Sequence, residues 1–289
     1  MDFKLTSDNF KVIEDLDFDL NGTRYLYFKL KKKDIDTISA LRLLSKKLKV
    51  PMDRFGYAGL KDKNAVTEQY VSVHGVPKSK LENLKLDSVQ VEVLGSSDKR
   101  IFLGGLNGNW FEVNVGDFKF IKSDFFENYF GEQRFGNKCE NHKIGKLLLL
   151  RKYDDEKVLE RLYLNSYQSY LWNLLVSNFV KKEDGFDVDY CLGKYRFIKK
   201  KIKNVPVPLV NFDTEFNGIA KNYVKILQDE GIKTSDFILK QKPYLVSDTV
   251  FRDLICDVKE ISYKNKVLKF FLGKGSYASV YLKKVISDS

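Results

Sequence analysis

Apolar and polar residues alternate along several stretches of the first 120 residues, as they do in half-buried strands. Thr67, Gln69, Val71 and Val73, for example, recur at every second position. The pair Asn21-Gly22 is typical of a turn between two such strands. The pattern therefore predicts strands over Phe10–Glu14, Thr23–Leu30, Thr67–Val73, Val89–Leu94 and Phe111–Val115.

Other stretches have apolar residues at helical spacing. The first begins after Asp36, a favourable N-cap residue, and Pro51 closes it. Its apolar stripe consists of Ile38, Leu41, Leu44 (or Leu43) and Leu48. Asp124 is a second potential N-cap, for a short helix that would end before Gly131. We expect longer helices over Thr37–Leu48, Asp155–Val180 and Asn217–Glu230, the last with Gly231 at its C′ position.

The remaining segments are less regular until the chain returns to strand-like alternation. Lys181–Asp189 is charged and predicts a loop. Residues 190–217 are expected to be irregular or stranded, with Pro206 and Pro208 marking an edge or a loop. The closing strands are predicted over Val250–Val258, Lys259–Tyr263, Val267–Leu272 and Ser276–Val285.

The composition is that of a folded, basic protein. The chain has 289 residues, enough for one large or two moderate domains, and 43% of them are hydrophobic. A net charge of +11 with 16 Tyr and 22 Phe supplies both cations and rings that can stack on bases. No apolar run reaches the ~18 residues of a membrane span, and the chain begins without an apolar signal core. We therefore expect a soluble, cytoplasmic protein that binds nucleic acid, not a membrane.

The three cysteines, Cys139, Cys191 and Cys256, lie far apart in the sequence. Their spacing argues against a disulfide framework and against a zinc knuckle. Cys139 and His142 form one C-x-x-H pair, but no second pair of ligands follows it. We therefore expect no metal site.

The stretch with the strongest candidate catalytic residues is Arg54–Val73, RFGYAGLKDKNAVTEQYVSV. Gly56 and Gly59 allow backbone conformations that other residues avoid, and the triplet Lys61–Lys63 follows them. Its central carboxylate, Asp62, lies between two lysines that we expect to be exposed. Two nearby cations should depress the pKa of this carboxyl, which would make it a nucleophile or a base. By itself, such a triplet is more often a solvated charged turn.

As a string, this stretch resembles the signature of the TruD family of tRNA pseudouridine synthases. The matching positions are Phe55, Ala58, Gly59, Leu60, Lys61, Asp62, Lys63, Ala65, Thr67 and Gln69. A match of this length is far more specific than a short glycine motif. In that family the aspartate of the signature is the catalytic residue, and the corresponding residue here is Asp62.

Further family motifs occur in order along nearly the whole chain. The N-terminal motif is carried by Lys4, Phe10, Val12 and Glu14, with Asn9 in place of an aspartate. A family lysine five residues before a threonine selects Lys32, before Thr37. The glycine motif corresponds to Leu103, Gly104, Gly108, Asn109 and Phe111. Asn128–Gly136 matches its motif without a mismatch. NSYQSYLWN (Asn165–Asn173) and the close FFLGKGSYASVYLKKV match with substitutions at Trp172, Ser279, Lys283 and Lys284.

The resemblance implies a catalytic Asp62 and a set of substrate-binding residues around it. Asn109 and Phe111 would line the site, although an ordinary core position is the alternative for Phe111. Gln133 and Arg134 would sit in a turn suited to hydrogen-bonding a phosphate or the signature loop. The complete substrate-binding set is Lys4, Phe10, Glu14, Lys32, Lys61, Asn109, Phe111, Gln133 and Arg134.

The family also implies a fold. We expect an α+β protein with the pseudouridine synthase fold: a mixed, largely antiparallel sheet, plus an inserted and shortened TruD-specific domain. The catalytic domain would comprise residues 1–137 and 246–289, and the inserted domain residues 138–245. RNA would lie in a basic cleft between them.

The implied reaction is that of an isomerase, an intramolecular transferase. The C1′–N1 bond of a uridine breaks, the base rotates, and it is rejoined through C5, after the nucleotide has been flipped out of the RNA. The aspartate would add to the sugar or the base, or draw a proton from the sugar. The family needs no cofactor and no metal. The expected partner is tRNA, usually at uridine-13 of the D arm, and the enzyme would be a monomer.

Two other classes of function compete with this one. A catalytically inactive module that binds tRNA or other RNA would have the same charge, but intact Asp62, Asn109 and Phe111 argue against it. An unrelated phosphate-binding enzyme could use Gly59 and Lys61, but the chain lacks a Walker motif.

Overall fold

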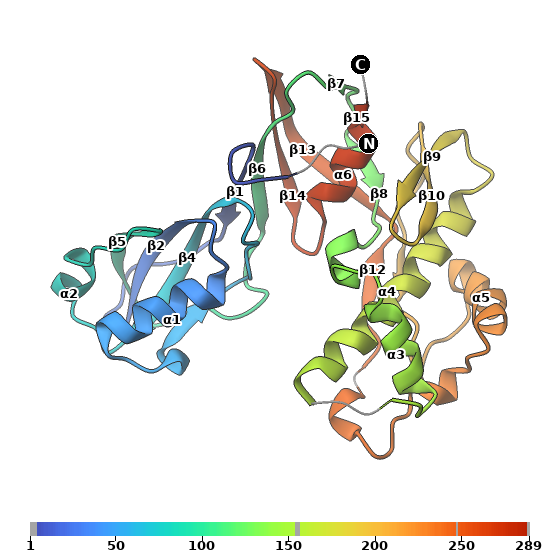
Figure 1. Ribbon diagram of the computed structural model, residues 1–289, viewed down its shortest axis with the longest axis horizontal. Helices are drawn as coiled ribbons and strands as arrows, with labels where there is room; N and C mark the ends of the chain where they lie inside the picture. Colours follow the sequence, from blue (N-terminus) through green and yellow to red (C-terminus); the bar gives the residue numbers. More distant parts are fainter. Residues whose placement is uncertain (1–4, 154–156, 247, 288–289) are drawn as a thin grey trace. The chain divides into compact units, whose positions relative to one another are not determined.

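The computed structural model describes residues 5–153, 157–246 and 248–287. The described chain forms two compact units (Figure 1). The first unit comprises residues up to 119 together with 258–275, and the second comprises residues 120–257 and 276–287. The domain boundaries predicted above, 1–137 with 246–289 and 138–245, stay a prediction.

The first unit is built on one sheet. Its strand order is β5 (Val89–Ser97), β2 (Tyr25–Lys33), β4 (Val66–His74), β1 (Phe10–Asp15), β6 (Gly108–Asn114), β14 (Val267–Gly273) and residues 258–264 of β13 (Ile255–Lys264). The short strand β3 (Phe55–Tyr57) also pairs with β4. Among the described strands of this sheet, β1 and β4 run parallel and the other pairs are antiparallel. The predicted mixed, largely antiparallel sheet is therefore confirmed.

Helix α1 (Thr37–Leu48) covers one face of this sheet, against β2 and β4 (Figure 1). As predicted, Asp36 caps the helix, because its carboxylate accepts a hydrogen bond from the backbone N–H of Ser39 at 2.9 Å. Leu44 is buried and Leu43 is exposed, which decides the apolar stripe in favour of Leu44. The helix packs on a cluster that includes Phe28, Leu30, Val71 and Val73.

The other face carries a smaller cluster, formed around Tyr27, Ala58, Ile101 and Leu106. The first unit also contains helix α2 (Lys78–Glu82) and the 3₁₀ turn η1 (Met52–Arg54). The predicted strands in this part of the chain are all present, with ends shifted by a few residues. Such shifts are expected, because pattern alone locates strand ends poorly.

The second unit contains most of the helices. They are α3 (Asn141–Leu149), α4 (Lys157–Val180), α5 (Asn222–Glu230) and α6 (Ala278–Val285), with 3₁₀ turns η2 (Glu132–Phe135), η3 (Gly218–Lys221), η4 (Thr234–Phe237) and η5 (Pro243–Leu245). Its short strands are β8 (Phe125–Glu127), β9 (Gly185–Tyr190), β10 (Gly193–Ile198), β11 (Pro206–Pro208) and β12 (Phe251–Asp253). The two remaining strands, β7 (Lys119–Phe120) and β15 (Ile286–Ser287), have two residues each. Gly231 ends α5 in the left-handed conformation, as predicted.

Helix α4 is the centre of the second unit. Trp172 is fully buried, and its indole N–H donates to the backbone oxygen of Asn128 at 2.8 Å. Asn173 accepts from the backbone N–H of Phe130 and donates to its carbonyl oxygen. These contacts fix the start of the Asn128–Gly136 motif against the helix. The aromatic side chain at position 172 is therefore a core residue.

Three predicted elements of the second unit are wrong. Ser276–Val285 is not a strand: it contains α6, in which six of the eight residues are buried, among them Ala278, Tyr281, Leu282 and Val285 at helical spacing. The helix predicted after Asp124 is replaced by β8, all three residues of which are buried. The loop predicted over Lys181–Asp189 contains most of β9, which pairs with β10. In each case pairing or packing with a distant segment overrides the local pattern.

The expectation for the cysteines also needs correction. Cys139 and Cys191 form a disulfide across a sequence separation of 52 residues. The bond joins the segment after η2 to the turn after β9, and the backbone N–H of Cys191 also donates to Glu132 at 2.9 Å. Sequence spacing could not reveal this pair, because only the fold brings the two turns together. Within 5–153, 157–246 and 248–287, no helix has the length and apolar character needed to cross a membrane.

Candidate active site

One face of the sheet in the first unit holds most of the predicted site residues. Residues paired directly across neighbouring strands project from the same face. One row across the strands contains Lys32, Thr67, Val12, Phe111 and Phe270. Two residues further along each strand, a second row contains Leu30, Gln69, Glu14, Asn109 and Leu272. The sheet thus brings together side chains from five strands at the end where α1 begins.

Glu14 and Lys61 form a buried ion pair in this row. The ammonium group of Lys61 lies 2.5 Å from Oε1 of Glu14, and both side chains are almost fully shielded from solvent. Oε2 of Glu14 accepts a further hydrogen bond from the backbone N–H of Tyr70 at 3.0 Å. The expectation that Lys61 is exposed beside Asp62 is therefore wrong. A buried carboxylate needs a charged partner, and Lys61 turns inward to supply it.

Lys32 holds the backbone of the signature loop. Its side chain is only 1% exposed, and its ammonium group donates to the backbone oxygens of Ile35 at 2.7 Å, Asp62 at 3.1 Å and Lys61 at 3.3 Å. Burial lowers the pKa of Lys32 to about 8, although the nearby carboxylates of Asp36 and Asp62 oppose the shift. All three donors of the ammonium are used. Lys32 thus positions the loop, and a direct contact with substrate stays a prediction.

A second set of hydrogen bonds fixes the same loop from α1 and β4. The hydroxyl of Thr37 donates to Oε1 of Gln69 at 2.8 Å and accepts from the backbone N–H of Lys61 at 2.9 Å. The amide nitrogen of Gln69 donates to the backbone oxygen of Gly59 at 3.2 Å. The loop is therefore held at residues 59, 61 and 62. The sequence pattern did not assign Thr37 to the site, although its spacing from Lys32 was part of the resemblance.

Asp62 presents its side chain to solvent from this rigid loop. Its backbone oxygen is bonded to Lys32, whereas its carboxylate is exposed, as is the neighbouring Lys63. An exposed carboxylate on a fixed backbone is available to an incoming ligand without a rearrangement of the core. This arrangement is what a nucleophile or a base requires.

Asn109 offers an unused acceptor beside the buried ion pair. It lies directly opposite Glu14 in the β1–β6 pairing. Its Oδ1 atom is buried and has no hydrogen-bond partner among the residues that the structure describes. Buried polar atoms are nearly always paired. The free acceptor is therefore suited to a ligand that carries an N–H group.

Phe111 is packed between two other rings. Because β6 lies between β1 and β14, its ring is flanked by Phe10, with centroids 5.9 Å apart, and by Phe270, with centroids 5.2 Å apart. Phe111 itself is 7% exposed. The stack leaves the ring little exposed, and contact of Phe10 or Phe111 with a substrate stays a prediction.

We expect the substitution Phe111→Ala to lower the free energy of unfolding by about 3–5 kcal/mol, the usual cost of removing a buried ring. Phe111→Leu retains an apolar side chain and should cost less. Denaturant unfolding of both variants measures this, and turnover is then compared under conditions where each variant is folded. An alanine variant as stable as the parent would show that the ring does not contribute to the core.

Gln133 and Arg134 lie in the second unit, in the 3₁₀ turn η2. The side chain of Arg134 donates to Ser169 Oγ at 3.3 Å, and Gln133 Oε1 accepts from Ser279 Oγ at 3.2 Å. Their predicted role in binding stays a prediction. Lys4, the remaining predicted residue, lies outside the described residues.

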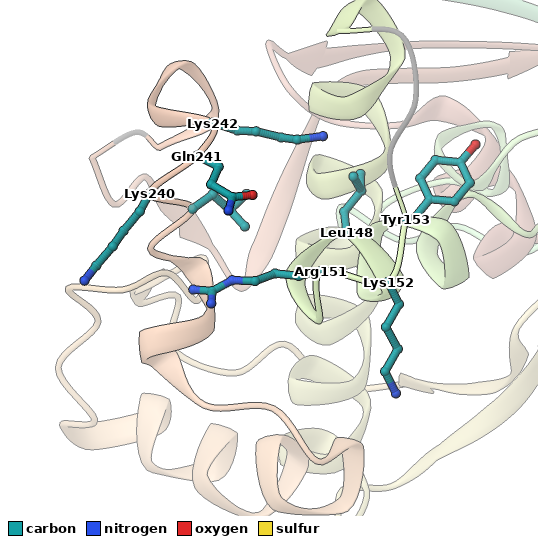
Figure 2. Close-up of a pocket in the computed structure, with 8 residues that line it drawn as sticks. Leu148, Arg151, Lys152, Tyr153, Lys240, Gln241 and Lys242 are labelled. Atoms are coloured by element: carbon teal, nitrogen blue, oxygen red, sulfur yellow. The ribbon is translucent and has the colours of Figure 1, made fainter.

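The second unit also contains a basic cavity of about 520 Å³ (Figure 2). Arg151, Lys152, Lys240 and Lys242 line it, with Leu148, Tyr153, Leu239 and Gln241. None of the predicted site residues that the structure describes borders this cavity. In the part of the chain that the structure describes, no group of three or more His, Cys, Asp or Glu side chains is placed to hold a metal ion.

The fold itself is one that has been seen in a solved structure. The crystal structure described as a TruD protein from Methanosarcina mazei superposes with a TM-score of 0.65 over 95% of this chain and 91% of that chain, at 21% sequence identity. The sheet and helices described above therefore form a fold of the pseudouridine synthase D type.

The sequence comparisons define the family more closely. The family model described as tRNA pseudouridine synthase D (TruD) matches residues 1–158 and 155–285. The chain belongs to the TruD family, and it is an isomerase of the TruD type.

Two curated relatives match along more than nine-tenths of their length. The tRNA pseudouridine synthase D of Aquifex aeolicus is 30% identical, with 95% of this chain and 94% of the relative covered. A relative from Archaeoglobus fulgidus, named a probable tRNA pseudouridine synthase D, is 24% identical, with 99% and 94% covered. That alignment extends over 388 positions, and this chain has 289 residues. The relative therefore carries segments that this chain lacks, in agreement with a chain that is short for its family.

Proposed function

We propose that this chain converts a specific uridine of tRNA, uridine-13 of the D arm, to pseudouridine. Membership of the TruD family supports the reaction class, and the names of its relatives support tRNA as the substrate. The observation that carries the proposal is the exposed carboxylate of Asp62 on a loop whose backbone is fixed by Lys32. The net charge of +11 suits an RNA substrate.

In the proposed reaction the C1′–N1 bond breaks, the uracil rotates, and a C1′–C5 bond forms. The proton of C5 is released to solvent and N1 gains a proton, so no oxidant, reductant or second substrate is needed. Asp62 acts on the flipped nucleotide either as a nucleophile, at the sugar or at the base, or as a base that draws a proton from the sugar. All three of these mechanisms require an ionised carboxylate at position 62.

The surrounding residues have separate roles in this proposal. The ion pair between Glu14 and Lys61 keeps a polar wall beside the uracil, with both carboxylate oxygens of Glu14 paired. The free acceptor of Asn109 receives the N3–H group of the base, a donor that uracil has in its plane. Lys32 fixes the loop. These groups orient a flipped base, whose extrusion from folded RNA costs a few kcal/mol.

The test is to incubate the protein with an unmodified tRNA transcript and map pseudouridine at single-nucleotide resolution. We expect one modified position, uridine-13, and no modification of a transcript that carries cytidine there. Modification at another uridine would refute the position but retain the reaction. A protein that binds the transcript tightly and modifies no uridine would instead be an RNA-binding module. The domain division, the monomeric state and a cytoplasmic location belong to the same proposal.

A further inference from the structure

Three large apolar side chains stand out as exposed around the signature loop. Leu60, next to Lys61 and Asp62, is 64% exposed, and Phe102 and Leu103 are 69% and 66% exposed. Single exposed apolar residues are common on protein surfaces, but a cluster beside a functional site marks an interaction surface. Leu103 is also the apolar position of the glycine motif, and the core does not account for it.

Backbone hydrogen bonds place the two segments side by side. The N–H of Gly104 donates to the carbonyl oxygen of Ala58 at 2.8 Å, which joins the segment of Phe102 and Leu103 to the segment of Leu60. The three side chains therefore project from adjoining parts of one surface. We call them the apolar rim.

The rim is held rigidly although it lies outside helices and strands. Gly104 has a φ of +83°, a left-handed conformation that favours glycine, and the N–H of Gly105 closes the turn onto Phe102. The ring of Phe102 lies against this turn, since a Cβ on Gly105 would come within 3.3 Å of it. Lys274 donates to the carbonyl oxygen of Gly104 at 3.1 Å. A surface fixed in this way loses little conformational freedom when it binds a ligand.

We propose that the apolar rim contacts the bases next to the target uridine and holds the RNA unstacked while that uridine is in the site. This inference rests on the proposed function, because it requires a nucleotide that is flipped toward Asp62. A uridine removed from its stack leaves two base faces exposed to water. Apolar side chains such as Phe and Leu cover such faces and are the residues that proteins insert at unstacked steps.

The alternative occupant is another protein. Charge favours RNA, because the segments that carry the rim also carry exposed cations, Lys63 on one side and Lys99 and Arg100 just before Phe102 on the other. Arg100 is held by the backbone oxygen of Phe55. Phosphates on either side of an unstacked base would lie near these cations, whereas a protein partner would need a matching acidic surface.

The experiment uses the full chain with Asp62→Asn, so that binding is read without turnover. A tRNA transcript carries 2-aminopurine, whose fluorescence rises when it is unstacked, next to uridine-13. The Asp62→Asn protein without a rim substitution, which is the parent here, should raise the fluorescence when it binds. The rim variants Phe102→Ala and Leu103→Ser should bind the transcript within a few fold of the parent but lose most of the rise. Leu43→Ser, at an exposed apolar position of α1, is the matched control and should retain it.

A second measurement uses the same rim variants with Asp62 intact. Turnover of folded tRNA should fall about 5- to 150-fold, the range for loss of one contact with a base face, while thermal melts stay unchanged because the side chains are exposed. A full fluorescence rise in the rim variants would overturn the inference, and so would a parent that gives no rise at all. If the protein with Asp62 intact modifies no uridine, the proposed function fails. If that protein is active and a rim variant is equally active, only the inference about the rim fails.

Discussion

Replacing Asp62 by asparagine is expected to abolish pseudouridine formation while the protein still folds and binds tRNA. The substitution retains the size of the side chain but removes the anionic oxygen that all three forms of the proposed chemistry require. We expect turnover to fall by more than about 10³-fold, as for other residues at the reacting centre. The measurement is release of a label from C5 of uridine in a tRNA transcript, beside a binding titration and a thermal melt.

The structure explains why folding should survive this change. The Asp62 side chain is exposed, and the contact that fixes the residue uses its backbone oxygen. Exposed substitutions away from caps and ion pairs usually change stability by less than about 0.5 kcal/mol. Asp53→Asn, at another exposed carboxylate of the same stretch, is the matched control and should remain active. Glu68→Gln, which also loses ion pairs with Lys11 and Lys31, should likewise remain active. Substantial turnover by the Asp62 variant would place catalysis on another residue.

Much of the first unit can be predicted from the sequence because its local patterns agree with its tertiary contacts. Helix α1 has a capping aspartate, a leucine stripe and a proline after its end, and each feature does in the structure what it does in isolated helices. Strand β1 alternates between buried and less buried residues throughout, and β2 and β4 alternate except at Leu26–Phe28 and Val71–Val73, where both faces are covered. Local preference and burial reinforce one another there.

The second unit was harder to predict, because its elements are decided by distant partners. The α6 segment contains Val280, Tyr281 and Val285, residues that also suit a strand. Six of its eight residues are buried, so its helical periodicity is weak in the sequence, and packing with distant segments decides that it is a helix. The disulfide between Cys139 and Cys191 left no trace in the sequence spacing for the same reason: only the fold brings the two turns together.

At the site, the sequence located the residues better than it located their partners. The resemblance selected Glu14, Lys32, Lys61 and Asn109, and the structure places all four in the first unit around the signature loop. The resemblance did not reveal that Lys61 turns inward to Glu14 instead of neutralising Asp62. A charge pair of this kind depends on which side chain is buried, and burial is set by the strand register, not by adjacency in the chain.

The second large effect is expected for Lys32→Met, which retains the length of the side chain but removes its three donors. The carbonyl oxygens of Lys61 and Asp62 would lose the contacts that fix them, and the carboxylate of Asp62 would no longer be held in one place. Misplacement of a reacting group by about 1 Å can cost about 10²-fold in rate, and we expect a loss of kcat of this size with tRNA affinity nearly unchanged. Lys33→Met, at the exposed neighbour, is the matched control.

The pH dependence separates positioning by Lys32 from a general loss of stability. The pKa of Lys32 is about 8 in the folded chain and 10.5 ordinarily, so between these values the unfolded chain binds more protons than the folded one. Raising the pH through this window therefore increases the contribution of Lys32 to the free energy of unfolding. A neutral amine, however, has only two N–H donors for three carbonyl oxygens. Turnover of the parent should therefore fall as the pH rises through about 8, whereas deprotonation of Lys32 should cause no fall in melting temperature. This step in turnover should be absent from Lys32→Met. A profile with the same step in both proteins would assign it to another group.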